Sequence, residues 1–123
     1  MQIHESGEDY LETILILSKR NDFVRSIDIV RELSYSKPSV SVAMKNLREN
    51  GYIEMADNGH ITLTEKGLQV ASKIYERHVF LSDWLVRLGV DPRTAVEDAC
   101  RMEHVISAES FAALKKHVAE SGE

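Results

Sequence analysis

The sequence predicts a mainly α-helical protein with one small β-hairpin, in which an N-terminal winged helix-turn-helix domain is followed by a second, helical domain. Three observations support this fold class. Apolar residues recur at helical spacing up to about residue 50, two short alternating segments follow, and helical spacing returns from Leu68 onward. The chain of 123 residues is long enough for one or two small cores.

The N-terminal helices are expected in a helix-turn-helix order. The first helix covers residues 7–19, and Ser6 is expected to cap its N-terminus. A short amphipathic helix follows over residues 26–33. After a brief polar break, a third helix begins at Lys37 and stops at Asn50-Gly51, a pair that terminates helices.

A β-hairpin is expected directly after the third helix. Residues 52–55 and 60–64 alternate between apolar and polar side chains, and Asp57-Asn58-Gly59 lies between them. Asn-Gly is the preferred two-residue hairpin turn. The hairpin would form the wing of the first domain.

The rest of the chain predicts a long helix and two shorter ones. The long helix runs from Leu68 to about Leu88, and the others cover residues 93–107 and 110–117. We therefore expect a winged helix-turn-helix domain over residues 1–71 and a helical metal-binding and dimerisation domain over residues 72–123. About 50 residues bury little core on their own, so a second copy of the chain is expected to cover the second domain.

Composition indicates a cytoplasmic protein without a membrane partner. No apolar run approaches the length of about 20 residues that a membrane span needs, and the N-terminus lacks the pattern of a signal peptide. The single cysteine, Cys100, cannot form an internal disulfide and is core, ligand or redox-active.

The net charge of −5 argues against nucleic-acid binding when it is taken alone. The charge is unevenly distributed, because residues 24–50 contain five Lys or Arg against three Asp or Glu. A local basic element can contact phosphate on an otherwise acidic protein.

One short segment near the C-terminus has the composition of a metal site. If residues 97–104 are helical, Cys100, Glu103 and His104 share one face, so a thiol, a carboxylate and an imidazole converge. These donors suit first-row transition metals. The alternative is a helix with a buried structural cysteine, a solvated glutamate and a partly exposed histidine.

Four segments together resemble the diphtheria-toxin-repressor family of metal-dependent transcriptional regulators. They are Glu8–Glu12, Ser36–Ser41, Tyr75–His78 and Glu97–Ser107, and the resemblance covers nearly the full chain. It is closest to the short manganese transport regulators, which do not have the SH3-like domain of longer iron-dependent repressors.

The resemblance implies a set of metal ligands and an effector. Asp9 and Glu12 resemble the manganese branch of the family, whereas Cys100 resembles the iron branch. Mn(II) or Fe(II) is therefore the expected effector, and Co(II), Ni(II) or Zn(II) are expected to bind in vitro. Acidic residues also suit a first helical turn, and His78 could be a boundary histidine on a dimer helix. The implied ligands are Asp9, Glu12, His78, Cys100, Glu103 and His104.

The resemblance also implies a double-stranded, palindromic DNA operator and a homodimer. Charges on the third helix could equally form a solvated face, and His60 could be either a wing contact or a turn residue. The apolar stripe of the long helix could be intramolecular core, although the small second domain favours a dimer interface. The expected DNA contacts are Lys37, Pro38, Ser39, Ser41 and Lys45, and the expected interface residues are Phe80, Leu81, Trp84, Leu85 and Leu88.

The sequence thus predicts a homodimeric, Mn(II)- or Fe(II)-dependent transcriptional regulator, expected to repress metal-uptake genes. An enzyme and a small organic substrate are not expected. A metal hydrolase could use the same ligands, but it would also need a separate general base, and no residue at motif spacing supplies one. The alternative is a redox-sensing winged-helix regulator that uses Cys100.

Overall fold

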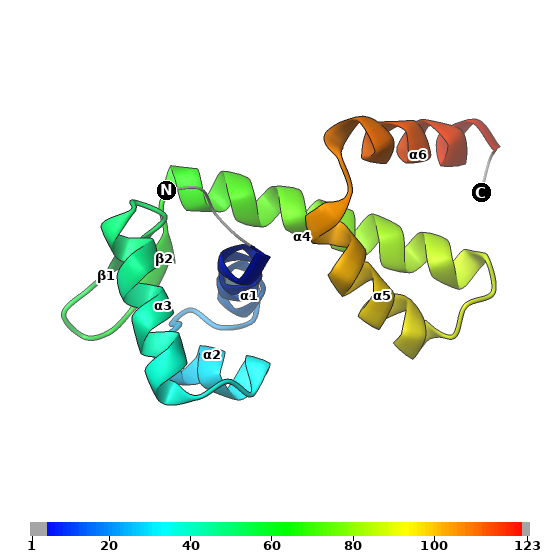
Figure 1. Cartoon of the computed structure of the whole chain (residues 1–123). Coiled ribbons are helices and arrows are strands. Elements are labelled where there is room, and N and C mark those ends of the chain that lie inside the picture. The colour runs from blue at the N-terminus through cyan, green and yellow to red at the C-terminus, as the bar shows by residue number, and fades with distance from the viewer. Residues whose placement is uncertain (1–4, 122–123) are drawn as a thin grey trace. The chain divides into compact units, whose positions relative to one another are not determined.

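The structure is a computed structural model and describes residues 5–121. Six helices and two strands follow in the order α1, α2, α3, β1, β2, α4, α5 and α6 within these residues (Figure 1). The predicted mainly helical fold class with one hairpin is confirmed. The chain divides into two compact units, Met1–Lys73 and Ile74–Glu123. No helix within residues 5–121 is long and apolar enough to cross a membrane.

The core of the first unit is built from α1 (Glu5–Arg20), the two helices that follow it, and the hairpin. Each helix buries one stripe of apolar residues at helical spacing. Because α1 already begins at Glu5, Ser6 lies inside the helix, and its predicted role as N-cap is wrong. The most deeply buried side chains of this core include Leu11, Ile14, Ile29, Val40, Met44, Ile53 and Ile61.

The helix-turn-helix consists of α2 (Ser26–Leu33) and α3 (Lys37–Glu49). Ser34 ends α2 in the left-handed region at φ 57°. Ser36 then caps α3, because its hydroxyl oxygen accepts a hydrogen bond from the Ser39 N–H at 3.2 Å. The turn between the helices is therefore determined by local side-chain chemistry.

The wing is an antiparallel hairpin of β1 (Ile53–Met55) and β2 (Ile61–Leu63). Its turn differs from the predicted two-residue form. The Ala56 N–H donates to the His60 carbonyl at 2.9 Å, and the Gly59 N–H donates to the Ala56 carbonyl at 2.8 Å. Three residues lie between Ala56 and His60, and Gly59 has a positive φ of 88°. A glycine in this conformation completes a three-residue hairpin turn, so the prediction of an Asn-Gly two-residue turn was wrong.

The wing is joined to α4 (Glu65–Arg87) by a close backbone approach at Gly67. The Thr64 N–H donates to the Tyr52 carbonyl at 3.1 Å, and the Thr64 hydroxyl donates to the Gly51 carbonyl at 2.6 Å. The Gly67 N–H in turn donates to the Thr64 hydroxyl at 3.2 Å. These bonds hold the start of α4 against the residue that precedes β1.

The second unit contains the C-terminal part of α4, α5 (Pro92–Val105) and α6 (Ala108–Ser121). Gly89, at φ 99°, ends α4, and the Asp91 carboxylate caps α5. The last helix is longer than predicted at both ends. The small core of this unit is formed by Leu81, Ala99 and Phe111, with Phe80, Trp84, Met102, Ile106 and Leu114 packed against it.

The Gly67→Ala variant is expected to lower the free energy of unfolding by about 1–3 kcal/mol. An added Cβ would lie 2.0 Å from the Tyr52 carbonyl oxygen, so the backbone must shift. At a helical site with free space, replacing glycine by alanine would raise stability by about 1 kcal/mol through helix propensity. The change expected at Gly67 has the opposite sign. Urea denaturation followed by circular dichroism measures the change.

Gln69→Ala is the matched control for this variant, because Gln69 is exposed on the same helix. It should change stability by no more than about 0.5 kcal/mol. A Gly67→Ala protein as stable as the wild type would contradict the close approach at Tyr52.

Candidate metal centre

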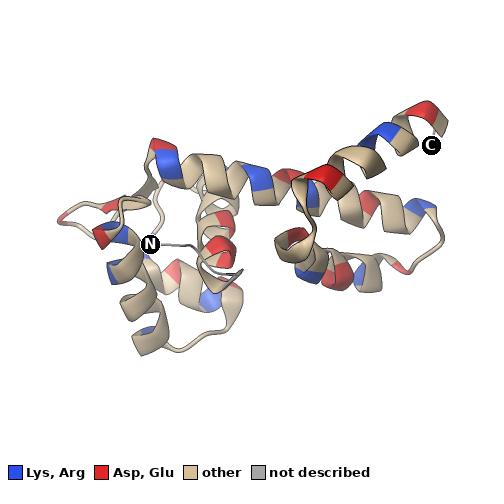
Figure 2. Ribbon diagram, turned by 45° about the horizontal axis from the view of Figure 1, so that its top comes forward, with Lys and Arg blue, Asp and Glu red and all other residues tan. Residues whose placement is uncertain are grey.

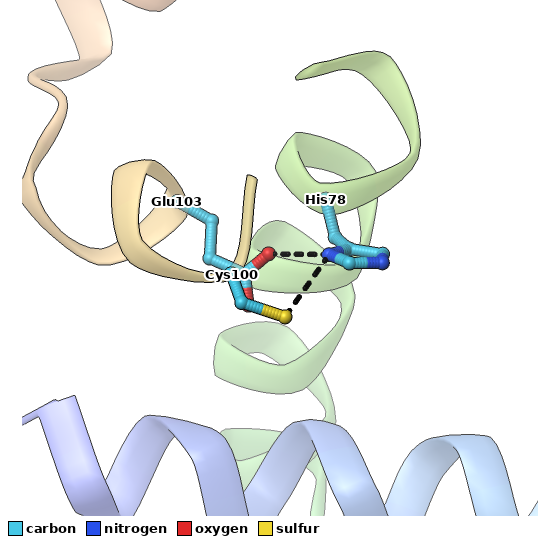
Figure 3. Close-up of side chains that lie close together, drawn as sticks. All are labelled: His78, Cys100 and Glu103. Atoms are coloured by element: carbon cyan, nitrogen blue, oxygen red, sulfur yellow. Dashed lines mark hydrogen bonds and ion pairs between the residues drawn. The ribbon is translucent and has the colours of Figure 1, made fainter. Parts of the chain in front are cut away.

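Three possible metal ligands converge in the second unit, from two different helices. His78 lies on α4, and Cys100 and Glu103 lie one turn apart on α5, so that the two α5 side chains share a face (Figure 3). One ligand atom of each residue lies within 4.8 Å of the others. His78 Nδ1 is 2.8 Å from Glu103 Oε2 and 3.9 Å from Cys100 Sγ.

The environment of His78 favours its charged form. Hydrogen bonding to Cys100 and then to Glu103 raises the pKa of His78 to about 10, while burial acts in the opposite direction. The imidazole is therefore protonated at neutral pH when no metal is bound. Its Nδ1–H then donates to the Glu103 carboxylate at 2.8 Å.

Glu103 is fully buried, and its two carboxylate oxygens differ in their contacts. Oε2 pairs with His78, whereas Oε1 has no hydrogen-bond partner and lies 3.4 Å from His104 Nε2. Burying a carboxylate oxygen without a hydrogen bond lowers the stability of the fold unless a nearby cation compensates its charge. The position of Oε1 therefore suits a metal ligand.

Arg77 holds the end of α5 against α4, and sequence reasoning missed it. Its Nη1 donates to the Glu103 carbonyl at 3.1 Å and to the Ile106 carbonyl at 2.8 Å. The side chain is buried, and its guanidinium carbon lies 5.6 Å from the centre of the Phe111 ring. Its position next to the candidate ligand His78 was the only hint that the sequence offered. Its partners could not be predicted, because the two carbonyls it contacts lie more than 25 residues away in sequence.

The donor set fits a transition-metal ion. A thiolate, an imidazole and a carboxylate together suit borderline ions such as Fe(II), Co(II), Ni(II) and Zn(II), and additional carboxylates favour Mn(II). Of the six predicted ligands, His78, Cys100 and Glu103 lie together. His104 follows directly on α5, with a nearly buried side chain. Asp9 and Glu12 lie on α1 in the first unit, and their role as ligands stays a prediction.

The predicted DNA contacts lie on α3, which carries Lys37, Lys45 and Arg48 and, near its end, the acidic Glu49 (Figure 2). Arg48 adds a further exposed cation to the same helix. The Ser39 hydroxyl accepts a hydrogen bond from Ser36 at 2.8 Å, so its position is held by the N-cap. Each of the predicted contacts is exposed: Lys37, Pro38, Ser39, Ser41 and Lys45.

One of the predicted interface residues needs correction. Leu81 has no exposed surface and forms the core of its own unit with Ala99 and Phe111, so it cannot contact a partner subunit. Phe80 and Trp84 are half-buried against that core. Leu85 is half-buried and Leu88 is 57% exposed. Sequence reasoning missed the exposed apolar side chains Val86, Val96 and Val105.

Two family profiles match this chain. The profile of the iron dependent repressor N-terminal DNA binding domain matches residues 2–61. The profile of the iron dependent repressor metal binding and dimerisation domain matches residues 64–121.

Relatives with similar sequences are transcriptional regulators. An uncharacterized HTH-type transcriptional regulator of Methanocaldococcus jannaschii is 37% identical over 113 residues, which cover 90% of this chain and 90% of the relative. The transcriptional regulator MntR of Escherichia coli O157:H7 is 34% identical over 115 residues, with 94% of this chain and 74% of the relative covered.

Solved structures with a similar fold include the manganese regulator SloR, with a TM-score of 0.82 and 28% identity over 97% of this chain and 55% of that chain. A manganese-dependent transcriptional repressor in complex with manganese has a TM-score of 0.84 and 25% identity, with 92% and 52% covered. The chain thus spans about half the length of these solved structures.

The stability of the metal-free protein is expected to fall as the pH rises from 6.5 to about 10. The pKa of His78 is about 10 in the folded state, against 6.5 for an ordinary histidine. The folded state therefore binds this proton more tightly than the unfolded state. The stabilising contribution of protonated His78 is complete below pH 6.5 and is lost as the pH approaches 10. Urea denaturation in the presence of a chelator measures this dependence.

His78→Gln should flatten the pH profile over this range, and His117→Gln, which changes an exposed histidine on α6, should leave it unchanged. If the free energy of unfolding changes with pH in the same way for the wild type and His78→Gln, the contacts of His78 do not raise its pKa.

Proposed function

The chain belongs to the iron-dependent repressor family, and from that premise we propose that it is a metal-dependent DNA-binding transcriptional repressor. We propose further that it acts as a homodimer and represses metal-uptake genes in the cytoplasm. The convergence of His78, Cys100 and Glu103 within 4.8 Å is the observation that carries this function.

The helix-turn-helix supports DNA as the partner. In this motif the second helix enters the major groove, and the wing lies beside the backbone. The exposed cations of α3 would meet phosphates, while Ser39 and Ser41 are short enough to approach base edges. A homodimer would place two α3 helices on the halves of a palindromic operator.

Mn(II) or Fe(II) is the proposed physiological effector. Similar solved structures that are named as manganese regulators support Mn(II), while a sulfur ligand from Cys100 favours softer ions. Co(II), Ni(II) and Zn(II) should also bind in vitro. Without metal, the proton on His78 supplies the positive charge in the cluster of His78, Cys100 and Glu103. A bound divalent cation would supply that charge instead. His78, Cys100, Glu103 and His104 are the proposed ligands of the second unit, and Asp9 and Glu12 are those of the first.

Ligands drawn from both units would couple the metal to DNA binding. If Asp9 and Glu12 share an ion with α5 residues, the two α3 helices of the dimer can adopt fewer positions relative to each other. Dimers that fit the operator then become more populated. The coupling is reciprocal, so operator DNA should tighten metal binding by the same factor.

The proposed dimer interface uses α4 residues that the core of the second unit leaves accessible. Leu88 is largely exposed, and Phe80, Trp84 and Leu85 are half-buried. A second copy would remove this apolar surface from water, which drives association.

Cys100 also supports a second candidate, a redox-sensing regulator. Its thiol is exposed and lies 3.9 Å from His78 Nδ1, so an oxidant in solution can reach the sulfur. Hydrogen peroxide would convert the thiolate to a sulfenate, with water as the second product. Cys100→Ser that keeps the metal response but loses a peroxide response would favour this function.

The proposed function predicts that metal tightens operator binding by about 5- to 150-fold. Palindromic duplexes are first enriched from a random library with the Mn(II)-loaded protein. Fluorescence anisotropy then measures binding of the enriched duplex at one fixed salt concentration, with Mn(II), anoxic Fe(II), Zn(II) or a chelator. Equal affinity in chelator and in every metal would refute metal dependence.

Glu103→Gln is the matched test of the cluster within this assay, because it keeps the side-chain shape and removes the charge. It should lose the metal response and retain the metal-free affinity. Glu97→Gln changes an exposed carboxylate on the same helix and should respond to metal as the wild type does.

A further inference from the structure

Val42 is an apolar side chain on the outward face of α3, the helix that we propose enters the major groove. It is 60% exposed, more than Tyr35 at 42% and Leu68 at 45%, the other large apolar side chains exposed among the described residues of the first unit. The buried stripe of α3 contains Val40, Met44 and Leu47. At about 100° per residue, the direction of Val42 around the helix axis differs by about 140–160° from the directions of these three residues. Val42 is therefore directed away from the core.

The surface around Val42 has the chemistry of a DNA-contacting face. A hollow of about 300 Å³ is lined by Val42 and by side chains of α2, α3 and β1. Two of the lining residues, Lys45 and Arg48, are cations, and no acidic residue lines the hollow. The remaining lining residues are Ser26, Ser41, Met44 and Met55. A single exposed valine is common on protein surfaces, but here it lines the same hollow as two cations suited to phosphate.

We propose that Val42 reads the C5 methyl group of a thymine in each operator half-site. The proposal rests on the proposed function, since it assumes that α3 enters the major groove. The thymine methyl is the apolar group that the four bases present in that groove. Val42 has no side-chain donor or acceptor, so it gains from covering a methyl group.

Other base edges are disfavoured by the same chemistry. Guanine, adenine and cytosine present acceptors or amino donors in the major groove. Val42 would remove these groups from water without replacing their hydrogen bonds, and an unsatisfied polar group is costly. The preference for thymine therefore comes from an attraction at the correct base and a penalty at the others.

Replacing thymine by deoxyuridine tests this inference, because it deletes the methyl group and keeps the base pairing. The probe is the palindromic duplex enriched by the Mn(II)-loaded wild type, with deoxyuridine placed at one symmetric thymine pair at a time. Anisotropy in Mn(II) should show about fourfold weaker wild-type binding per half-site at one pair, as burial of one methyl-sized group implies. At that pair Val42→Ala should bind the two duplexes equally.

Val42→Thr keeps one γ-methyl group and should show an intermediate discrimination. Leu68→Ala is the matched control, since it shortens an exposed aliphatic side chain of the same unit outside α3, and it should discriminate as the wild type does. Thermal unfolding checks that each variant is folded. The Thr variant also keeps the test decisive if the Ala variant is unstable.

Two outcomes would overturn the proposal. The wild type could bind all deoxyuridine duplexes as tightly as the thymine duplex, or Val42→Ala could keep the full discrimination. Failure of the proposed function looks different, because the library would then yield no duplex that the protein binds in a metal-dependent way.

Discussion

A buried carboxylate governs the arrangement of the second unit. Burying the charge of Glu103 costs free energy unless positive groups compensate it. His78 supplies that compensation from α4 at 2.8 Å, and His104 lies 3.4 Å from the other oxygen. Arg77 fixes the end of α5 through two backbone carbonyls and thereby keeps Glu103 facing His78. The packing of α4 against α5 is thus inseparable from the charge balance of the cluster.

The same balance explains how the cluster can accept a metal. The elevated pKa of His78 means that a proton holds the cluster together at neutral pH. A histidine that holds a metal must be deprotonated at the ligating nitrogen, so a divalent cation would have to displace this proton and would supply positive charge in its place. The buried Oε1 of Glu103 is positioned to accept that cation. Metal affinity should accordingly depend on pH through His78.

Local sequence patterns predicted the elements but not every partner. The helical spacing of Cys100 and Glu103 could be predicted because residues three or four positions apart share one face of an α-helix. The contact with His78 depends instead on how α4 packs against α5. The apolar stripe of α4 was ambiguous, since seven of the ten residues from 79 to 88 are apolar and spacing alone does not say which of them face inward. Leu81 faces the core, and Leu88 faces out. Periodicity also identified Val40 as buried but gave no role to Val42.

Cobalt(II) absorption tests most directly whether Cys100 and its neighbours form a metal site. Cobalt bound by a thiolate gives a charge-transfer band in the near ultraviolet, and its visible bands report the coordination geometry. The wild type is expected to develop this band at one equivalent of Co(II). Cys100→Ser should lose the ultraviolet band and keep weakened visible bands. A wild-type spectrum identical to that of Cys100→Ser would show that the thiolate does not hold the metal.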